Sequence, residues 1–396
     1  MKEFTVKYPF LNKDVKIYEQ ENGHKIVLAY KEGEMVNISS WVKTGSINEN
    51  DENNGISHFL EHLMFKGTHK HKAGEFDRIL ESKGAIVNAA TWKDYTFYYV
   101  TLPKGNSDEN FNLAVELHAD MMTDPVIPDY EMGAPFDINN KNVTDKRERH
   151  VVIEEIRMRK DQPWTKVYNA TNNAMYTSHP YKRDVIGTPQ IIAGVSREEV
   201  LDYYHKFYAP NNMTTIVVGD FNHEEVLNKI CELFDFSDRD CLPNIERPID
   251  EPTKTTKIVE STSDVNTSFI IYGWLCPQAK ELKQTIMLEM LSVILGDGQS
   301  SRLNQNLIEK VQNPIFNALA TDFYNFRDGG NFFIDANLKA GCEKEAIDAI
   351  NDQIKGIFEN ITDNTSIPSI APPNLITTPL PIPDRTPPNI AHNNKS

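Results

Sequence analysis

The spacing of apolar residues predicts a sheet backed by helices in the first part of the chain. The first 45 residues read as paired strands, because apolar stretches flank the turn dipeptide Asn22-Gly23. Helical apolar spacing follows at 56–66 and 74–84. Residues 85–102 are rich in β-branched and aromatic side chains, which favour strands. The pattern alternates between the two kinds of element, as in a mixed α/β domain.

The same order of strands and helices recurs further along the chain. An almost wholly apolar run at 213–221 is typical of a strand inside a sheet. The charged, proline-containing residues 237–256 read as a linker. We therefore predict an α+β fold with two similar α/β domains, at 1–236 and 257–360, each a mainly antiparallel sheet flanked by helices. Further helices are expected at 108–124, 146–160, 164–176, 280–298, 300–311 and 343–359.

The end of the chain changes in composition. Eight of the 22 prolines lie after residue 367, so residues 361–396 are predicted to form a disordered or polyproline-like tail. The second domain is then shorter than the first. Either this domain is trimmed, which leaves apolar surface exposed or covered by a partner, or its fold is incomplete.

Composition narrows the classes of partner and compartment. With a formal charge of −16, the chain repels phosphate backbones, so nucleic acid is not an expected partner. Its four cysteines form no C-x-x-C pair and read as reduced thiols. No signal peptide is evident, no arginine precedes Arg78, and no run of about 18 apolar residues occurs. These features predict a soluble, cytoplasmic protein without a membrane segment.

The stretch GISHFLEHLMFKGT at 55–68 carries the clearest chemistry. His58 and His62 are four residues apart, so both imidazoles lie on one helical face and can share a zinc ion. Glu61 lies beside that pair, where it can take a proton from a metal-bound water. This H-x-x-E-H order is the inverse of H-E-x-x-H. Two core histidines bonded to backbone carbonyls are the alternative interpretation.

A catalytic zinc needs a third protein ligand, and the helix predicted at 146–160 offers Glu154 and Glu155. Glu155 shares its face with valines one turn earlier, whereas Glu154 shares its face with charged and polar residues. A carboxylate on an apolar face requires a partner, which favours Glu155. Glu148, two turns before Glu155, is expected to orient an imidazole. An ordinary charged helix with accidental spacing is the alternative.

The chain resembles the M16-type zinc peptidases, the family of pitrilysin, insulin-degrading enzyme and the mitochondrial processing peptidase. The similar stretches occur in the family's order and cover roughly residues 10 to 345. They are GISHFLEHLMFKGT, GEFDRILESKGAIVNAATWKDYTFYYVTLP, ERHVVIEEIRMRKDQP, HPYKRDVIGTPQII, FYAPNNMTTIVVGDF and LGDGQSSRLNQNL.

The resemblance implies roles for these candidate residues. It implies one zinc ion per chain, bound by His58, His62 and Glu155, with Glu61 as general base and Glu148 as supporting carboxylate. It further implies an edge strand that pairs with extended peptide substrates through Asn88, Ala89 and Ala90. Strand addition of this kind gives affinity through the backbone. Plain sheet packing is the alternative interpretation of these three residues.

The sequence departs from the family in ways that bear on activity. Residues 132–145 look like an inserted surface loop before the ligand helix. Family members that act as one long chain, and the partner subunit of two-part enzymes, have an Arg and a Tyr seven residues apart in the later domain. At the corresponding positions this chain has Ile308 and Ile315. That pattern resembles the zinc-bearing subunit of two-part enzymes, whose zinc-free homologous partner supplies the pair.

The leading expectation is therefore a zinc metalloendopeptidase. A scaffold or binding subunit that keeps the zinc site but turns over poorly is the main alternative. A metal-dependent hydrolase acting on something other than peptides is a third.

Overall fold

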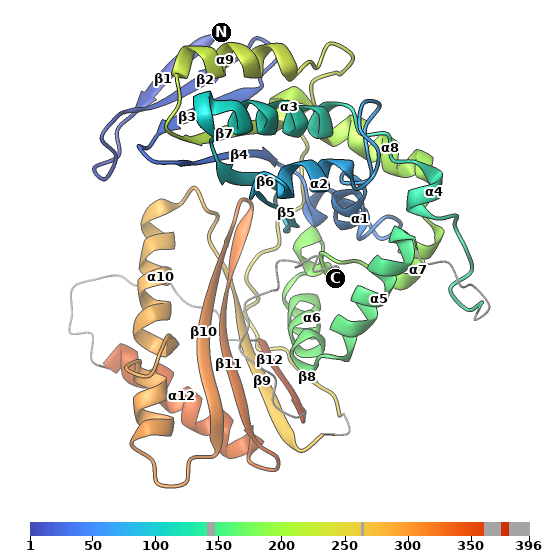
Figure 1. Cartoon of the computed structure of the whole chain (residues 1–396). Helices are drawn as coiled ribbons and strands as arrows, with labels where there is room; N and C mark the ends of the chain where they lie inside the picture. Colours follow the sequence, from blue (N-terminus) through green and yellow to red (C-terminus); the bar gives the residue numbers. More distant parts are fainter. Residues whose placement is uncertain (141–146, 263–264, 360–373, 380–396) are drawn as a thin grey trace. The chain divides into compact units, whose positions relative to one another are not determined.

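The computed structural model describes residues 1–140, 147–262, 265–359 and 374–379 (Figure 1). Contacts within the chain divide it into two units. Unit 1 comprises Met1–Arg157 and Asp184–Glu246, and unit 2 comprises Met158–Arg183 and the described residues from Arg247 onward. Among the described residues, no helix is both long and apolar enough to cross a membrane.

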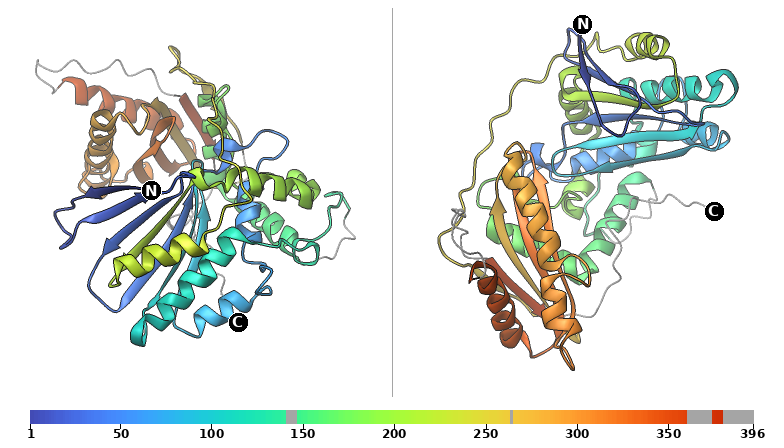
Figure 2. Two further views of the ribbon diagram at one scale, coloured as in Figure 1. Left: turned by 90° about the horizontal axis from the view of Figure 1, so that it is seen from above. Right: turned by 90° about the vertical axis from the view of Figure 1, so that its left-hand side faces the viewer.

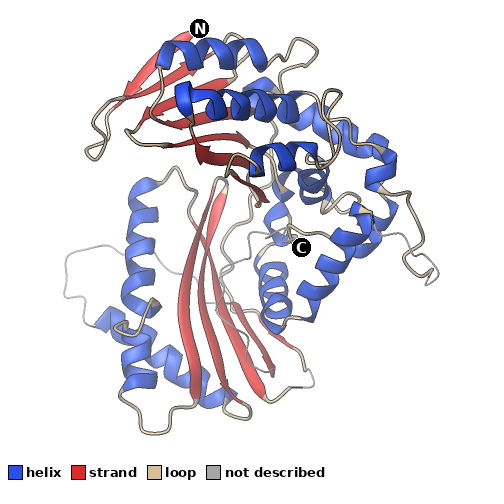
Figure 3. Cartoon of the chain, viewed as in Figure 1, coloured by secondary structure: helices blue, strands red, loops and turns tan. Residues whose placement is uncertain are grey.

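Unit 1 is built on a seven-stranded sheet in the order β1-β2-β3-β7-β4-β6-β5. Strands are drawn in red and helices in blue in Figure 3. Neighbouring strands are antiparallel except for the parallel pair β3–β7. The apolar β7 lies inside the sheet, as its sequence predicts. The strands are β1 (Lys2–Val6), β2 (Val15–Glu19), β3 (Lys25–Tyr30), β4 (Met35–Val42), β5 (Ile86–Thr91), β6 (Thr96–Pro103) and β7 (Met213–Gly219).

Helices pack on this sheet and enclose the core of unit 1 (Figure 2). Residues of β6 and β7 alternate between buried and half-buried, which is the pattern of strands with one face in the core, whereas β4 has three successive buried residues at 38–40. The α-helices of unit 1 are α1 (Ile56–Leu63), α2 (Glu75–Glu81), α3 (Glu109–Thr123), α4 (Asp129–Met132), α5 (Glu148–Asp161), α7 (Pro189–Gly194), α8 (Arg197–Phe207) and α9 (His223–Leu233). Short 3₁₀ turns are η1 (Ser46–Asn48), η2 (Asn106–Asp108) and η4 (Pro210–Asn212).

Unit 2 contains a five-stranded sheet in the order β10-β11-β9-β12-β8. Its strands are β8 (Ile258–Glu260), β9 (Thr267–Cys276), β10 (Phe316–Phe326), β11 (Gly329–Lys339) and β12 (Asn374–Pro379). Its helical segments are α6 (Pro163–Met175), η3 (Pro180–Lys182), α10 (Leu282–Gly296), α11 (Arg302–Asn304), the π-helical turn η5 (Gln305–Glu309) and α12 (Glu343–Glu359). Two sheets flanked by helices give the α+β class that the sequence predicts.

The strand β9 is covered on both faces within unit 2. Ile270 and Tyr272 belong to the core formed with α10 and α12, whereas Phe269 stacks edge-on against Trp164 of α6. A Cβ atom on Gly273 would lie 2.8 Å from Thr171 Cγ2, so the missing side chain permits close approach of α6. Because successive residues of a strand point to opposite faces, the long apolar run of β9 suits this double burial.

The division into units differs from the sequence-based domain boundaries at α6. This helix falls within the predicted first domain, 1–236, but it packs on β9 and belongs to unit 2. The predicted linker 237–256 is likewise tied to unit 2 at Asp250, whose carboxylate accepts backbone N–H groups of residues 177–179 at 2.7–3.1 Å. The periodicity of a helix does not tell which sheet it covers, so the sequence could not assign α6.

The strand β12 corrects the prediction of a disordered tail for residues 374–379. It pairs in parallel with β8 and antiparallel with β9, as β7 does with β3 and β4 in unit 1. The run Leu375–Thr378 has β-prone side chains, and Pro379 lies at the end of the strand, where a missing N–H is tolerated. The other residues of the predicted tail lie outside the described residues.

The helix α10 exposes apolar side chains to solvent. They recur at helical spacing and include Leu282, Ile286, Met290 and Val293. An exposed stripe of this kind is typical of a surface that another polypeptide covers.

Candidate metal centre

The helix α1 is fixed at its first turn by the buried carboxylate of Glu49. Its oxygens accept the backbone N–H groups of Gly55 and Ser57 at 2.8 and 2.9 Å. They also accept the Ser57 hydroxyl at 2.5 Å and the Asn54 amide at 2.7 Å. A negative group at a helix N-terminus satisfies donors that the helix leaves without partners. Burial raises the pKa of Glu49, and these hydrogen bonds act in the opposite direction.

The apolar side chains of α1 set the direction of its histidines. Ile56, Phe59, Leu60 and Leu63 are buried in the core of unit 1. His58 and His62 lie one above the other, and their ring centroids are 4.7 Å apart. The packing of the apolar face therefore holds both imidazoles in place.

The helix α5 brings its carboxylates to those imidazoles. Val152, Ile153 and Ile156 are buried, and the guanidinium of the buried Arg149 donates from Nε to the Gly133 carbonyl at 3.0 Å. Gly133 belongs to the predicted insertion 132–145, of which 141–145 lie outside the described residues. The insertion is thus not wholly a surface loop, because its first residues anchor α5.

His58, His62 and Glu155 come together as a trio. Glu155 Oε2 lies 3.7 Å from His58 Nε2 and 3.6 Å from His62 Nε2. One ligand atom from each of the three residues lies within 4.8 Å of the others. A tetrahedral shell with bonds of about 2.1 Å separates its ligand atoms by about 3.4 Å. The two nitrogens and one carboxylate oxygen thus fit a zinc ion with a fourth position left for water.

The neighbouring Glu154 faces away from the trio. It is exposed and forms an ion pair with Arg157 on the same helix. The structure therefore brings Glu155, and not Glu154, to the histidines.

Glu148 supports His62 from behind. Its Oε1 lies 2.9 Å from His62 Nδ1, and its Oε2 lies 2.5 Å from Lys66 Nζ. A carboxylate at Nδ1 keeps the proton on that nitrogen and leaves Nε2 free to bind a metal. Burial works against its charge, yet the contacts with His62 and Lys66 lower the pKa of Glu148 below its usual value.

Glu61 is buried beside the trio and held by strand β5. Its Oε2 accepts the hydroxyl of Thr91 at 2.6 Å. Burial raises the pKa of Glu61, and the nearby His62 and the Thr91 hydrogen bond oppose that rise. Thr91 and the helix-capping Glu49 are residues that the sequence did not single out. Thr91 bonds Glu61, 30 residues earlier in the chain, and Glu49 bonds Ser57, 8 residues later. No local sequence motif marks either contact.

The three residues expected to contact substrate lie on β5. This strand ends the seven-stranded sheet, so among the described residues its outer edge has no strand partner. Asn88 and Ala90 pair with Tyr99 and Phe97 of β6 and point to one face, and Ala89 points to the other. The two isoleucines that replace the family's Arg and Tyr, Ile308 and Ile315, pack against the core of unit 2.

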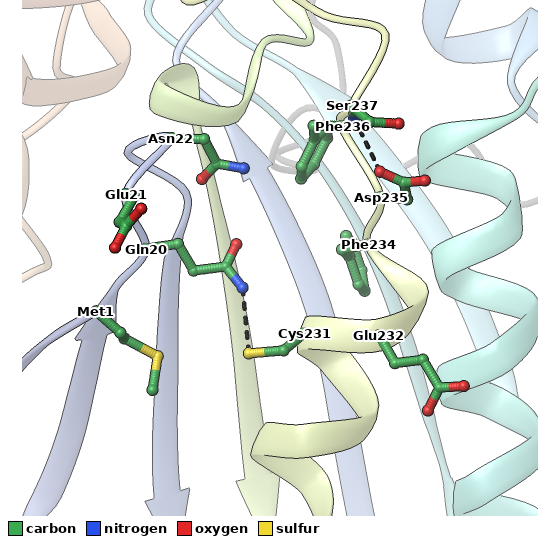
Figure 4. Close-up of a pocket in the computed structure, with 10 residues that line it drawn as sticks. All are labelled: Met1, Gln20, Glu21, Asn22, Cys231, Glu232, Phe234, Asp235, Phe236 and Ser237. Atoms are coloured by element: carbon green, nitrogen blue, oxygen red, sulfur yellow. Dashed lines mark hydrogen bonds between the residues drawn. The ribbon is translucent and has the colours of Figure 1, made fainter.

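A pocket of unit 1 lies near the end of β2 and α9 (Figure 4). Gln20 Nε2 donates to Cys231 Sγ at 3.1 Å there, and the Ser237 backbone N–H donates to Asp235 at 2.8 Å. None of its lining residues is a candidate ligand, base or substrate contact. It is a feature separate from the metal centre.

Comparison with known proteins agrees with this fold. Residues 25–189 match the family model described as Insulinase (Peptidase family M16), and residues 194–365 match the model described as Peptidase M16 inactive domain. The chain is 31% identical over 300 residues to the uncharacterized zinc protease YmxG of Bacillus subtilis, covering 74% of this chain and 67% of that protein. It is 31% identical over 299 residues to the zinc protease PqqE of Helicobacter pylori, covering 73% of this chain and 63% of that protein.

Solved structures share the architecture. A protease from Helicobacter pylori aligns with a TM-score of 0.76 and 26% identity, covering 89% of this chain and 82% of that chain. A peptidase M16 inactive domain from Pseudomonas fluorescens aligns with a TM-score of 0.77 at 16% identity, over 88% and 80% of the two chains, which shows the fold alone.

The fold, the two family models and the relatives named zinc proteases define a zinc metallopeptidase-type architecture. The chain belongs to peptidase family M16. It spans about two thirds of the length of the curated relatives that it matches.

Proposed function

We propose that the chain is a zinc-dependent metallopeptidase with one zinc ion bound by His58, His62 and Glu155. The observation that carries the proposal is the meeting of Glu155 Oε2 with both imidazole Nε2 atoms at 3.6–3.7 Å. The side chain of Glu155 is 33% exposed and those of His58 and His62 are 12% and 14% exposed, so a metal ion held by the three would be within reach of water. Membership of a peptidase family supports a metal ion.

Glu61 acts as the proton carrier in this proposal. When bound, zinc supplies Lewis acidity toward a peptide carbonyl and its attacking water. Glu61 takes the proton of that water and delivers it to the leaving amine. Glu148 keeps His62 in the tautomer whose Nε2 is available as a ligand. Each of these side chains is held by a contact within unit 1, so little reorganisation accompanies the reaction.

The proposed substrate class is based on the outer edge of β5, which has no strand partner among the described residues. An extended peptide can add to this edge as a further strand, with main-chain hydrogen bonds to residues 88–90. Backbone pairing demands little of the substrate sequence. The proposal is therefore cleavage within extended peptides or unfolded polypeptides.

The test measures zinc content and cleavage of a quenched peptide library for the wild type and Glu61→Gln. The wild type should bind one zinc ion and cleave peptides, whereas Glu61→Gln should keep the zinc and lose hydrolysis. Wild-type turnover in Glu61→Gln would exclude Glu61 as the base. A wild-type protein that binds no zinc would exclude the metallopeptidase proposal.

A second candidate function is a scaffold or binding subunit that pairs with a zinc-free homologous chain. Ile308 and Ile315 offer no polar group for a substrate, and α10 exposes an apolar stripe that a partner would cover. Peptide cleavage by the purified chain alone favours the first candidate. Cleavage that requires an added homologous chain favours a two-part enzyme. Zinc binding without cleavage, both by the chain alone and with the added chain, favours the scaffold.

A further inference from the structure

The hydroxyl of Thr91 holds the candidate base by one oxygen. The Thr91 hydroxyl donates to Glu61 Oε2 at 2.6 Å, and the backbone N–H of Thr91 also hydrogen-bonds this carboxylate. Hydrogen bonds to charged acceptors are short and about twice as strong as neutral ones. Glu61 is 7% exposed, which removes competing water from this contact. The bond therefore selects one orientation of the Glu61 side chain.

The neighbours of Thr91 direct its single proton toward Glu61. Thr96 Oγ1 lies 3.3 Å from Thr91 Oγ1 and 2.9 Å from the carbonyl of Thr44, which can only accept. Thr96 has a single hydroxyl proton, and the Thr44 carbonyl is its nearer acceptor. The Thr91 hydroxyl is likewise closer to Glu61 Oε2, at 2.6 Å, than to Thr96 Oγ1, at 3.3 Å. The chain of hydroxyls positions Thr91 without withdrawing its hydrogen bond from Glu61.

Thr91 is also the last residue of the edge strand β5 and follows directly after Ala90. A peptide that pairs with residues 88–90 takes its register from the same backbone that carries the Thr91 hydroxyl. One short segment thereby fixes both the substrate and the base. A displacement of about 1 Å between reacting groups can reduce turnover about 100-fold.

We infer that Thr91 is a positioning residue that sets Glu61 relative to a peptide bound along β5. The inference rests on the proposed peptidase function. Thr91 makes no contact with the reacting atoms in this account. It acts through Glu61, whose carboxylate it orients toward the attacking water.

The test compares Thr91→Val, which removes the hydroxyl at nearly constant shape, with Thr91→Ser, which restores it. Thr101→Val is the matched control, because Thr101 lies on β6 and its hydroxyl contacts Asn37. We expect Thr91→Val to lower kcat about 10- to 100-fold with zinc content and KM unchanged. The kcat of Thr91→Ser and of Thr101→Val should stay within about threefold of the wild-type value, because both variants keep the alignment of Glu61.

Two results would overturn the inference from kinetics. One is a wild-type kcat in Thr91→Val, and the other is a loss in Thr91→Ser or Thr101→Val as large as that in Thr91→Val. The second result would assign the threonine a role in packing alone.

Crystal structures of the zinc-loaded Thr91→Val and Thr91→Ser proteins separate this inference from the proposed function. The Glu61 carboxylate should move in the valine variant and keep its place in the serine variant. If the wild type proves inactive, the peptidase proposal fails while these structures still decide the positioning. An unmoved Glu61 in Thr91→Val refutes it.

Discussion

Removal of the carboxylate of Glu148 should weaken zinc binding by a predictable amount. The pair Glu148–His62 joins two largely buried side chains through a contact of 2.9 Å. Hydrogen bonds to charged groups contribute about 1.5–3 kcal/mol, and each 1.4 kcal/mol corresponds to about tenfold in affinity. Glu148→Ala should therefore raise the dissociation constant of zinc about 10- to 100-fold. Glu148→Gln keeps an acceptor without the charge and should fall between the alanine variant and the wild type.

The assay is competition for zinc with a chelator of known affinity, at fixed pH and ionic strength. Glu154→Ala is the matched control, because Glu154 lies on the same helix but pairs with the exposed Arg157. The control should bind zinc as the wild type does. A Glu148→Ala protein whose affinity stays within twofold of the wild type would refute the reasoning. So would an equal loss in the control.

Three further predictions concern stability, each measured by urea unfolding. Glu49→Ala leaves buried donors at the start of α1 without an acceptor and should cost about 3 kcal/mol or more; a cost below about 1 kcal/mol would contradict this. Burial lowers the pKa of His24 to about 4 and of His118 to about 3, so both stay neutral in the folded state. The stability that each neutral histidine provides is complete above its pKa in the unfolded state, about 6.5. As the pH falls below that pKa, the free energy of unfolding decreases, by about 2 kcal/mol for each histidine between pH 7 and pH 5. A stability that is unchanged over that range, or that rises toward pH 5, would contradict the assignment. Gly273→Val places atoms against Thr171 and should destabilise the packing of α6 on β9 by about 1–3 kcal/mol, whereas an unchanged midpoint would show that α6 adjusts freely.

Local periodicity was enough to predict the pair of histidines. A helix repeats every 3.6 residues, so His58 and His62 must share a face wherever α1 packs. The choice of Glu155 over Glu154 rested on an apolar face, and the structure supports that argument only in part. Val152 is buried, but Val151 is 46% exposed, so the rotation of α5 is set by Val152, Ile153 and Ile156.

Contacts between distant segments could not be predicted from the sequence. Nothing near Thr91 indicates that its hydroxyl meets Glu61, because that contact depends on how α1 packs beside β5. The domain of α6 depends on the small residue at 273, which in sequence reads as one glycine among apolar residues. The strand β12 was hidden by the prolines around it, since composition outweighed the short β-prone run.

The place of β7 has a consequence for synthesis on the ribosome. This strand joins β3 to β4, so the hairpins on either side of it form two separate half-sheets until residue 219 has been made. All three candidate zinc ligands emerge earlier, because Glu155 precedes β7 by more than 50 residues. The nascent chain thus contains all three candidate zinc ligands before the seven-stranded sheet is complete. A zinc ion that arrived during translation would encounter an incomplete unit 1. We therefore expect stable zinc binding only after β7 has inserted between β3 and β4.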